Sequence, residues 1–372
     1  MRVIIIANGF QEDYIQNLIP GVAKHITKIE FIGSDIYSFP DNSHIEFHNL
    51  RGSHDENAGV PRKAIRLFNY YIKLIWYLVK SKASVVHVKW VRFEWIDGVI
   101  IPFLIQLLGK KVIYTAHNVI PHNTSGWWWE FKFKRIYLQQ DLILVHSTFI
   151  KDELIAKFGI RPEKVTVLSH GVYRVPDNKQ IDKASAKKEL GIPDDKFVVL
   201  FFGKISKYKG FDLLVKASEL MKNTHDRFFL VAGKVNPDYK DEFDQIRQRC
   251  KDDSFLFLSK HLSEREVEVC FKASDVCVLP YREASQSGVL FMAYAYGRPV
   301  IAPNIGGFKE DIVLGKTGLL FSGAEEASLA SVLDTASSVE FLDSKDMKEY
   351  VESTYSWDTI GKNLANIYKR LI

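Results

Sequence analysis

The chain has 372 residues, of which 47% are hydrophobic and 26% charged, and its formal net charge is +5. This composition excludes an intrinsically disordered protein, and the length predicts two domains, because it exceeds what one ordinary core can hold. The longest apolar stretch after the start, 99–108, is broken by Pro102 and Gln106, so we predict no segment that crosses a bilayer.

The first half of the chain alternates apolar runs with helical patterns. The run at 3–7 is too short for the apolar core of a signal peptide, so we expect no signal peptide. Strands that alternate with helices are typical of a parallel sheet covered on both faces. The expected strands are 3–7, 29–32, 85–88, 111–116, 142–146 and 164–168, and the expected helices include 64–80 and 98–108.

A polar segment rich in Pro, Asp and Lys then predicts a linker at 176–191, which ends in a short helix at 183–190. We expect one domain at 1–175, completed by the helical tail 357–372, and a second domain at 192–356. Ligands of such α/β domains bind beyond the carboxyl ends of the strands, here in a cleft between the domains. The second domain repeats the pattern, with strands at 197–202, 228–232, 255–258, 276–279 and 299–302, and helices at 211–221, 240–250, 264–273 and 289–296.

Two lysines flank the loop that follows the strand 197–202. Lys204 comes directly after Gly203, and Lys209 precedes Gly210, where the next helix begins. Two cations on one such loop suit a diphosphate, whose charge must be neutralised when it departs. The alternative is that both are ordinary surface lysines.

A second phosphate-type element lies about 80 residues further on. Ser287, Gly288 and Val289 form the first turn of an apolar helix, where unpaired N–H groups attract phosphate and a glycine lets a ligand approach. A simple cap by Ser285 or Ser287 is the alternative, and both can hold together. Glu283 precedes this turn and can accept hydrogen bonds from sugar hydroxyls, unless it is only an exposed loop charge.

The first domain offers weaker candidates. His117 and Asn118 follow the strand 111–116 and are expected to point toward the cleft, where His117 can hold a donor hydroxyl or position the acceptor. His122 shares this loop, and Gly9 ends the first strand in a tight turn beside the ligand. Neither histidine has cysteine or carboxylate partners at metal-ligand spacing, so we predict no bound metal and no cofactor. The three cysteines also lack such spacing and fit a reducing cytoplasm.

The run Trp127-Trp128-Trp129, followed by Lys132, Lys134 and Arg135, is similar to an interfacial membrane anchor. The segment 64–82 adds further lysine and arginine among aromatic residues. Residues 1–175 also carry 22 Lys and Arg against 15 Asp and Glu, which suits an anionic membrane surface or a phosphorylated acceptor. A packed helix, an aromatic acceptor pocket and a merely solvated surface are the alternatives.

Over essentially its full length the chain resembles glycosyltransferase family 4, whose fold is GT-B, two Rossmann-like domains facing a cleft. The matching segments are FFGKISKYKGFDLL, FLSKHLSEREVEVCFKASDVCVLPY, ASQSGVLFMAYAYGRPVIAPNIGGFKEDIV, GKTGLLF and YSWDTIGKNLANIYKRL, and TAHNVIPH is similar to the cleft loop of polysaccharide-building members.

The resemblance implies a retaining hexosyltransferase that uses a nucleotide sugar, a UDP- or GDP-sugar, held mainly by the second domain. The acceptor, a saccharide or lipid-linked saccharide of surface polysaccharide biosynthesis, would bind the first domain, at the cytoplasmic face of the membrane. Lys204 and Lys209 match the family's basic pair on the diphosphate, residues 287–289 match the turn for the distal phosphate, and His117 matches the cleft histidine.

One departure concerns two glutamates that the family commonly places eight positions apart around this helix. Their positions fall on Ala284 and Met292 here, and Glu283 lies one place from the first. An inactive relative that binds a sugar nucleotide therefore stays open as an alternative, as does a nucleotide-sugar epimerase of GT-B shape. A dehydrogenase is disfavoured because no GxGxxG follows the first strand, and nucleic-acid binding because the basic residues form no recognisable module.

Overall fold

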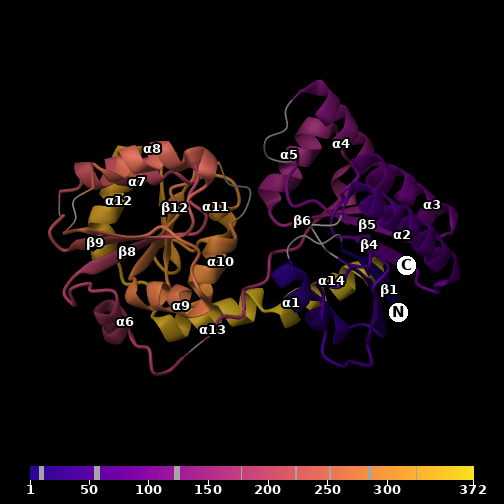
Figure 1. The fold of residues 1–372 in the computed structure, drawn as a ribbon, viewed down its shortest axis with the longest axis horizontal. Coiled ribbons are helices and arrows are strands. Elements are labelled where there is room, and N and C mark those ends of the chain that lie inside the picture. Colours follow the sequence, from indigo (N-terminus) through magenta and orange to yellow (C-terminus); the bar gives the residue numbers. More distant parts are fainter. Residues whose placement is uncertain are drawn as a thin grey trace. The chain divides into compact units, whose positions relative to one another are not determined.

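The computed structural model describes residues 1–7, 12–53, 59–120, 126–176, 178–222, 224–250, 253–283, 287–323 and 325–372. The chain forms two compact units, Met1–Gly171 with Tyr355–Ile372, and Val172–Thr354 (Figure 1). The expected linker 176–191 lies within the second unit. There α6 (Lys183–Glu189) packs through Ala186 on Val269 of α9 (Glu264–Ala273).

The first unit is built on a seven-stranded parallel sheet in the order β3-β2-β1-β4-β5-β6-β7. The expected strands all form, with ends within one residue of the predicted ones. The edge strand β3 was not predicted, since it is only four residues long and none of them is fully buried. The strands are β1 (Arg2–Ile6), β2 (Lys28–Ile32), β3 (Ile45–His48), β4 (Val85–Val88), β5 (Lys111–Thr115), β6 (Leu142–Val145) and β7 (Val165–Val167).

Helices cover both faces of this sheet, because successive buried residues of each strand point to opposite sides. Ile4 and Ile6 of β1 join one core with α2 (Val60–Lys80), α3 (Ile101–Leu107), α4 (Trp127–Gln139) and α5 (Thr148–Phe158). Val3 and Ile5 join the other core with α1 (Glu12–Ala23) and α14 (Trp357–Arg370). A π-helical turn, η1 (Ile96–Ile100), precedes α3, and a 3₁₀ turn, η2 (Pro162–Lys164), precedes β7.

The contact between α1 and α14 brings backbone against backbone. A Cβ atom on Gly21 would lie 2.2 Å from the carbonyl oxygen of Trp357, and one on Gly361 would lie 2.4 Å from the carbonyl carbon of Gly21. Both positions therefore require glycine. The predicted helical tail thus belongs to the first unit.

The second unit has a six-stranded parallel sheet in the order β10-β9-β8-β11-β12-β13. Its strands are β8 (Phe197–Phe202), β9 (Arg227–Ala232), β10 (Phe255–Leu258), β11 (Val276–Val278), β12 (Val300–Pro303) and β13 (Gly318–Phe321). All but β13 were predicted. In both sheets the strand order reverses at one point, between β1 and β4 and between β8 and β11, and ligands of open α/β sheets bind beyond the strands at such points.

One face of the second sheet packs on α7 (Phe211–Leu220), α8 (Lys240–Arg247) and α12 (Glu326–Thr335). On the opposite face Phe271 of α9 lies against Phe202, with ring centroids 4.8 Å apart. Figure 1 shows α7 and α8 on one side of the sheet and α6 and α9 on the other. The remaining elements are η3 (Lys207–Lys209), η4 (Pro237–Tyr239), α10 (Gly288–Ala295), α11 (Phe308–Asp311), η5 (Ala336–Ser338) and α13 (Ser344–Tyr355).

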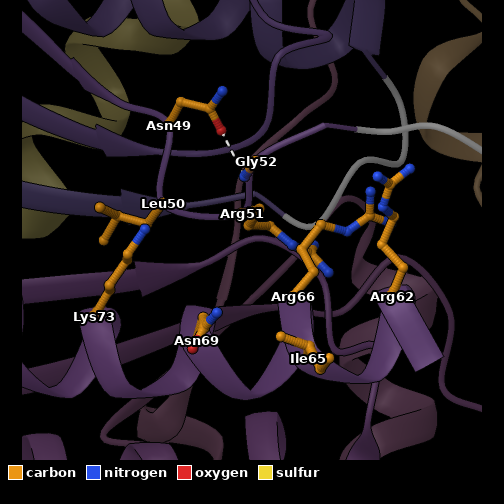
Figure 2. Close-up of a pocket in the computed structure, with 9 residues that line it drawn as sticks. All are labelled: Asn49, Leu50, Arg51, Gly52, Arg62, Ile65, Arg66, Asn69 and Lys73. Carbon is orange, nitrogen blue, oxygen red and sulfur yellow. Dashed lines mark hydrogen bonds between the residues drawn. The ribbon is translucent and has the colours of Figure 1, made fainter. Parts of the chain in front are cut away.

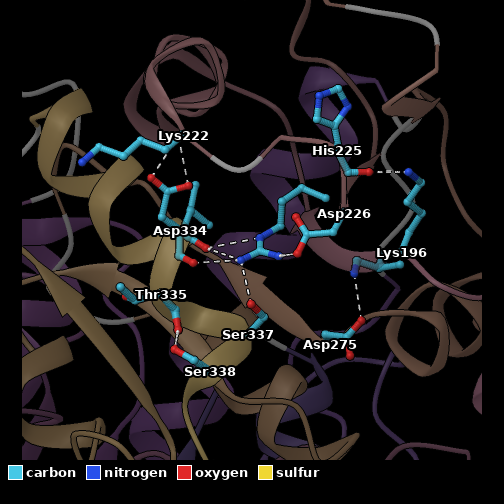
Figure 3. Close-up of polar contacts among 12 residues, drawn as sticks. Lys196, Lys222, His225, Asp226, Asp275, Asp334, Thr335, Ser337 and Ser338 are labelled. Atoms are coloured by element: carbon cyan, nitrogen blue, oxygen red, sulfur yellow. Dashed lines mark hydrogen bonds and ion pairs between the residues drawn. The ribbon is translucent and has the colours of Figure 1, made fainter.

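A buried arginine closes the end of α12. Arg227 Nη2 donates to the carbonyl oxygens of Leu333 (3.1 Å) and Asp334 (3.0 Å) and to Ser337 Oγ (2.8 Å), and its Nη1 pairs with Asp226 at 2.6 Å. Figure 3 shows Asp226, Asp334 and Ser337 converging on this point. The arginine thereby satisfies helix-terminal carbonyls that have no partner within the helix.

None of the helices that the structure describes is long and apolar enough to cross a membrane.

Candidate functional site

The site in the second unit is centred on Lys209, whose side chain turns back toward the end of β8. The residue is only 7% exposed. Its Nζ lies 2.8 Å from the position that a Cβ atom would take on Gly203, and 5.2 Å from the ring centroid of Tyr281. Burial lowers the pKa of Lys209 to about 8. The reversal point of this sheet thus holds an ammonium group in a poorly solvated position.

The loops after β8 and β11 are locked together here. Gly210 has φ 72°, and a Cβ atom on it would lie 1.9 Å from the carbonyl oxygen of Pro280. Arg282 donates to both carboxylate oxygens of Asp212, at 2.9 and 2.5 Å, and to the carbonyl of Lys207 at 2.9 Å. This bidentate pair ties the loop after β11 to the first turn of α7 and fixes the turn that presents Lys209.

The first turn of α10 meets the same point. Val289 Cγ2 lies 3.3 Å from the Cβ position of Gly203, so Lys209 and Val289 flank one glycine. Ser287 stands at the N-cap but makes no side-chain cap; its hydroxyl donates instead to Tyr281 Oη at 3.3 Å. The capping alternative therefore fails for Ser287, whereas Ser285 lies outside the described residues. A Cβ atom on Gly288 would come 2.9 Å from Tyr173 Oη.

Lys204 and Glu283 differ from these residues. Both side chains are exposed, and within the described segments neither makes a hydrogen bond or an ion pair. Met292 lies one turn into α10 and is partly exposed. The structure therefore gathers Lys209, Ser287, Gly288 and Val289 around Gly203 and Tyr281, and leaves Lys204 and Glu283 at the surface.

In the first unit, His117 belongs to an aromatic cluster at the carboxyl ends of the strands. Its ring centroid lies 5.8 Å from that of Tyr14, 5.2 Å from Trp90 and 4.9 Å from His146. Burial, with the nearby His146 and Lys89, holds the pKa of His117 well below its usual value. The imidazole is therefore neutral and suited to hydrogen bonding rather than to ion pairing.

The sequence analysis missed Lys89, which follows β4 and is almost fully buried. Its Nζ donates to Thr115 Oγ1 at 3.0 Å and to Tyr14 Oη at 3.2 Å, and burial lowers its pKa to about 7. His87 lies beside it, 2.7 Å from the same hydroxyl of Thr115 and 2.6 Å from Tyr368 Oη. The position of Lys89 directly after a strand was the one sequence signal that could have found it.

Of the other candidates of this unit, the structure describes Asn118. Its backbone carbonyl accepts a hydrogen bond from Tyr137 Oη at 3.2 Å. Gly9 and His122 lie outside the described residues. Across the ranges that the structure covers, no cluster of three His, Cys, Asp or Glu side chains could hold a metal ion.

The tryptophan run divides between core and surface. Trp127 and Trp128 are 76% and 48% exposed, whereas Trp129 packs against the core. Lys132, expected at a membrane surface, is buried, with its Nζ 3.6 Å from Glu94 and 3.9 Å from the Trp129 ring centroid. The expectation for Lys132 was wrong, because Glu94, 38 positions earlier in the chain, folds back to pair with it.

Two family models together match most of the chain. Residues 11–173 match the model described as Glycosyltransferase Family 4, and residues 182–354 match Glycosyl transferases group 1. The chain belongs to glycosyltransferase family 4 and is a glycosyltransferase. Its two sheets with helices on both faces are those of the GT-B fold.

Individual relatives agree with this assignment. D-inositol 3-phosphate glycosyltransferase of Corynebacterium aurimucosum is 27% identical over 300 residues, which cover 74% of this chain and 69% of that protein. An uncharacterised glycosyltransferase of Methanocaldococcus jannaschii is 24% identical over 234 residues, or 61% of this chain and 59% of that protein.

Solved structures show the same fold at low identity. Sucrose-phosphate synthase of Thermosynechococcus elongatus has a TM-score of 0.75 at 18% identity and covers 100% of this chain and 99% of its own. HepE of Anabaena, in complex with UDP and glucose, has a TM-score of 0.70 at 16% identity, with 100% of both chains covered.

Proposed function

We propose that this glycosyltransferase transfers a hexose, with retention, from a UDP- or GDP-sugar to a saccharide or lipid-linked saccharide of surface polysaccharide biosynthesis. The observation that carries the proposal is the buried ammonium of Lys209 beside Gly203 and the first turn of α10. An ammonium held in a poorly solvated position, next to a helix N-terminus, suits an anionic diphosphate. HepE, of similar fold, has been crystallised with UDP and with UDP-glucose.

In this reaction the bond between the anomeric carbon and the diphosphate oxygen breaks, and the acceptor hydroxyl oxygen bonds to the same carbon. The acceptor proton passes to the departing diphosphate, which leaves on the face where the acceptor arrives. Lys209 and the N–H groups at the start of α10 stabilise the charge that develops on the leaving group. His117, being neutral, holds a sugar or acceptor hydroxyl by a hydrogen bond. No metal or cofactor is assigned to the reaction.

The test begins with thermal-shift measurements against UDP, GDP, ADP, CMP and their common sugar conjugates. Selective stabilisation by one nucleoside diphosphate supports the donor site and identifies the base. Turnover of the matching sugar nucleotide with saccharide acceptors then checks the transfer. Donor binding without turnover for any acceptor or for water would indicate that the protein is an inactive relative. This alternative stays open because Met292 stands where the family commonly has a glutamate. Conversion of the donor without any acceptor would indicate an epimerase.

We also propose that the protein acts at the cytoplasmic face of an anionic membrane. Trp127 and Trp128 support this, because they project from α4 with most or half of their surface exposed, and Phe131 stacks on Trp128 at 5.9 Å. Replacing both tryptophans by alanine should reduce co-sedimentation with vesicles. Unchanged sedimentation would leave this aromatic patch as an acceptor or packing surface.

A further inference from the structure

The helix α2 divides its surface among three faces. Tyr70, Leu74 and Leu78, spaced four residues apart, are buried against the sheet. A second face is apolar yet exposed; Phe68 and Trp76, for example, are 67% and 60% exposed. Spacings of three and four residues place these side chains along one stripe. The exposed stripe consists of Ile65, Phe68, Ile72, Ile75, Trp76 and Val79.

The third face of α2 is basic and forms one wall of a pocket of about 470 Å³. Arg62, Arg66 and Lys73 lie on it at spacings of four and seven residues, and Asn69 lies between them. The segment that follows β3 supplies the opposite wall, with Arg51 as a fourth cation. Figure 2 shows Arg62 and Arg66 extending from the helix toward this segment, with Lys73 nearer Leu50.

The pocket has a defined shape on its loop side. Asn49 Oδ1 accepts a hydrogen bond from the backbone N–H of Gly52 at 2.8 Å, and Gly52 has φ 75°. The guanidinium of Arg51 lies over the ring of Tyr70, 5.1 Å from its centroid, and Arg66 donates to the carbonyl of Ser53. Two of the four cations are thus held in place before any ligand arrives.

The described side chains that line this pocket carry charges of one sign. None of the nine lining residues that the structure describes is acidic. Among the described residues, which leave out 54–58, no carboxylate pairs with Arg62, Arg66 or Lys73. Like charges gathered in one concavity repel, and an anion with several oxygen atoms relieves this repulsion. Arginine forks match phosphate oxygens in particular.

We propose that this pocket binds the phosphate headgroup of an anionic membrane lipid, while the exposed stripe of α2 enters the acyl region beside it. The stripe decides between a lipid and a free phosphate, because a water-soluble anion would gain nothing from six exposed apolar side chains next to its site. An apolar face bordered by a basic one is the pattern of a helix that lies in a membrane surface. The inference deepens the membrane association proposed above and rests on it.

The test is sedimentation with phosphatidylcholine vesicles made with and without phosphatidylglycerol. In the variant Arg62→Glu/Lys73→Glu we expect binding to the anionic vesicles to fall at least about ten-fold. The matched control is Lys362→Glu/Lys369→Glu, which makes the same change in net charge at exposed positions of α14, and it should keep most of the binding. The thermal unfolding curve of each variant checks that it is folded.

A second variant separates a headgroup pocket from diffuse attraction. Arg62→Lys/Arg66→Lys conserves the charge but removes the two-pronged guanidinium geometry. A phosphate pocket therefore predicts weaker binding of this variant to anionic vesicles, whereas diffuse attraction predicts unchanged binding. Calorimetric titration with inorganic pyrophosphate, without vesicles, is the remaining arm. Tight binding of pyrophosphate with no vesicle binding would overturn the lipid proposal in favour of a soluble phosphate.

The outcomes distinguish this inference from the proposals on which it rests. If the wild-type protein binds anionic vesicles and the pocket variants bind equally well, the pocket assignment is wrong and membrane association stands. If the wild-type protein binds no vesicles, both fail. Thermal stabilisation by the nucleoside diphosphate is measured in the same samples and tests the donor site alone.

Discussion

The ammonium nitrogen of Lys209 lies 2.8 Å from the point where a Cβ atom on Gly203 would stand. The lysine therefore fills the space that a side chain at residue 203 would need. Since the same Cβ would lie 3.3 Å from Val289 Cγ2, one glycine separates the cation from the first turn of α10. Substitutions of Lys209 and of Gly203 therefore test whether this ammonium group belongs to the donor site.

The variant Lys209→Met should weaken binding of the nucleoside diphosphate by about 2 kcal/mol, or about thirty-fold in Kd, because a charge-assisted hydrogen bond is lost. Without ligand, the variant should melt at a higher temperature than the wild-type protein, because a buried charge is replaced by an apolar chain of similar length. Calorimetry and thermal unfolding measure the two effects. The control is Lys207→Met, at an exposed neighbour that pairs with Glu242 at 3.0 Å.

The pH dependence of stability provides a further check on Lys209. Its pKa of about 8 in the folded protein lies below its usual value of 10.5, so the unfolded chain binds the proton more readily between these pH values. The free energy of unfolding should therefore rise as the pH increases from 8 to 10.5. This rise should be smaller in Lys209→Met; equal slopes in both proteins would contradict a poorly solvated ammonium.

Replacing Gly203 by alanine should abolish stabilisation by the nucleoside diphosphate, because the new methyl group displaces Lys209. It should also destabilise the folded state by about 1–3 kcal/mol, since φ is 105° at this position. The control is Gly191→Ala: Gly191 has φ 68°, and no atom lies within 4 Å of its Cβ position. That variant should lose stability and keep its ligand response. A normal ligand response in Gly203→Ala would remove Lys209 from the site.

The histidines beside Tyr14 should make the protein sensitive to acid. Burial lowers the pKa of His146 to about 3 and that of His170 to about 4, so the unfolded chain takes up protons first. The free energy of unfolding should therefore fall as the pH drops below about 6.5. The variant His146→Asn should show a shallower fall than the wild-type protein, whereas exposed His225→Asn should match it. Melting temperatures between pH 4 and pH 7 measure this.

His117→Ala should lower the rate of sugar transfer and leave the Kd of the nucleoside diphosphate unchanged. The reason is that the candidate phosphate contacts all lie in the second unit, whereas His117 lies in the first. Steady-state kinetics and calorimetry separate the two quantities. A weaker Kd with an unaltered kcat would reverse this assignment.

Arg227→Met should destabilise the folded protein by about 2–4 kcal/mol, because it leaves the carbonyl groups of Leu333 and Asp334 buried without their donor. The control is Arg249→Ala. Arg249 makes an exposed bidentate pair with Glu219, at 2.6 and 2.8 Å, and the loss should be about 1 kcal/mol or less. Denaturant unfolding measures the loss in the free energy of unfolding for both variants. Equal losses would show that the buried contacts of Arg227 add little to stability.

Local pattern was sufficient for most of the fold. Strands such as Phe197–Phe202 are continuous apolar runs and were predicted with their observed ends. The short strands β3 and β13 were missed, since the four residues of β3 alternate apolar with polar side chains and the four of β13 begin with a glycine. Lys209 could be singled out as a candidate from the sequence because it follows a strand, and that place can be read from neighbouring residues.

Contacts between distant residues could not be predicted in this way. Arg282 and Asp212 are 70 positions apart, and only the packing of the loop after β11 against the start of α7 reveals that they pair. Likewise, Lys132 looked like a surface residue in sequence, but Glu94 and Trp129 enclose it. The basic pocket on α2 was visible only as scattered lysines and arginines until Arg51 was placed opposite them.

The pairing of α1 with α14 has a consequence for synthesis of the protein. The last helix is translated only after the whole second unit, yet it covers apolar residues of the first unit such as Leu18 and Val22. While the nascent chain emerges from the ribosome, the second unit can fold before the first unit is complete. The first unit must wait with one sheet face partly uncovered, and it closes only when Trp357 and the residues after it have been released.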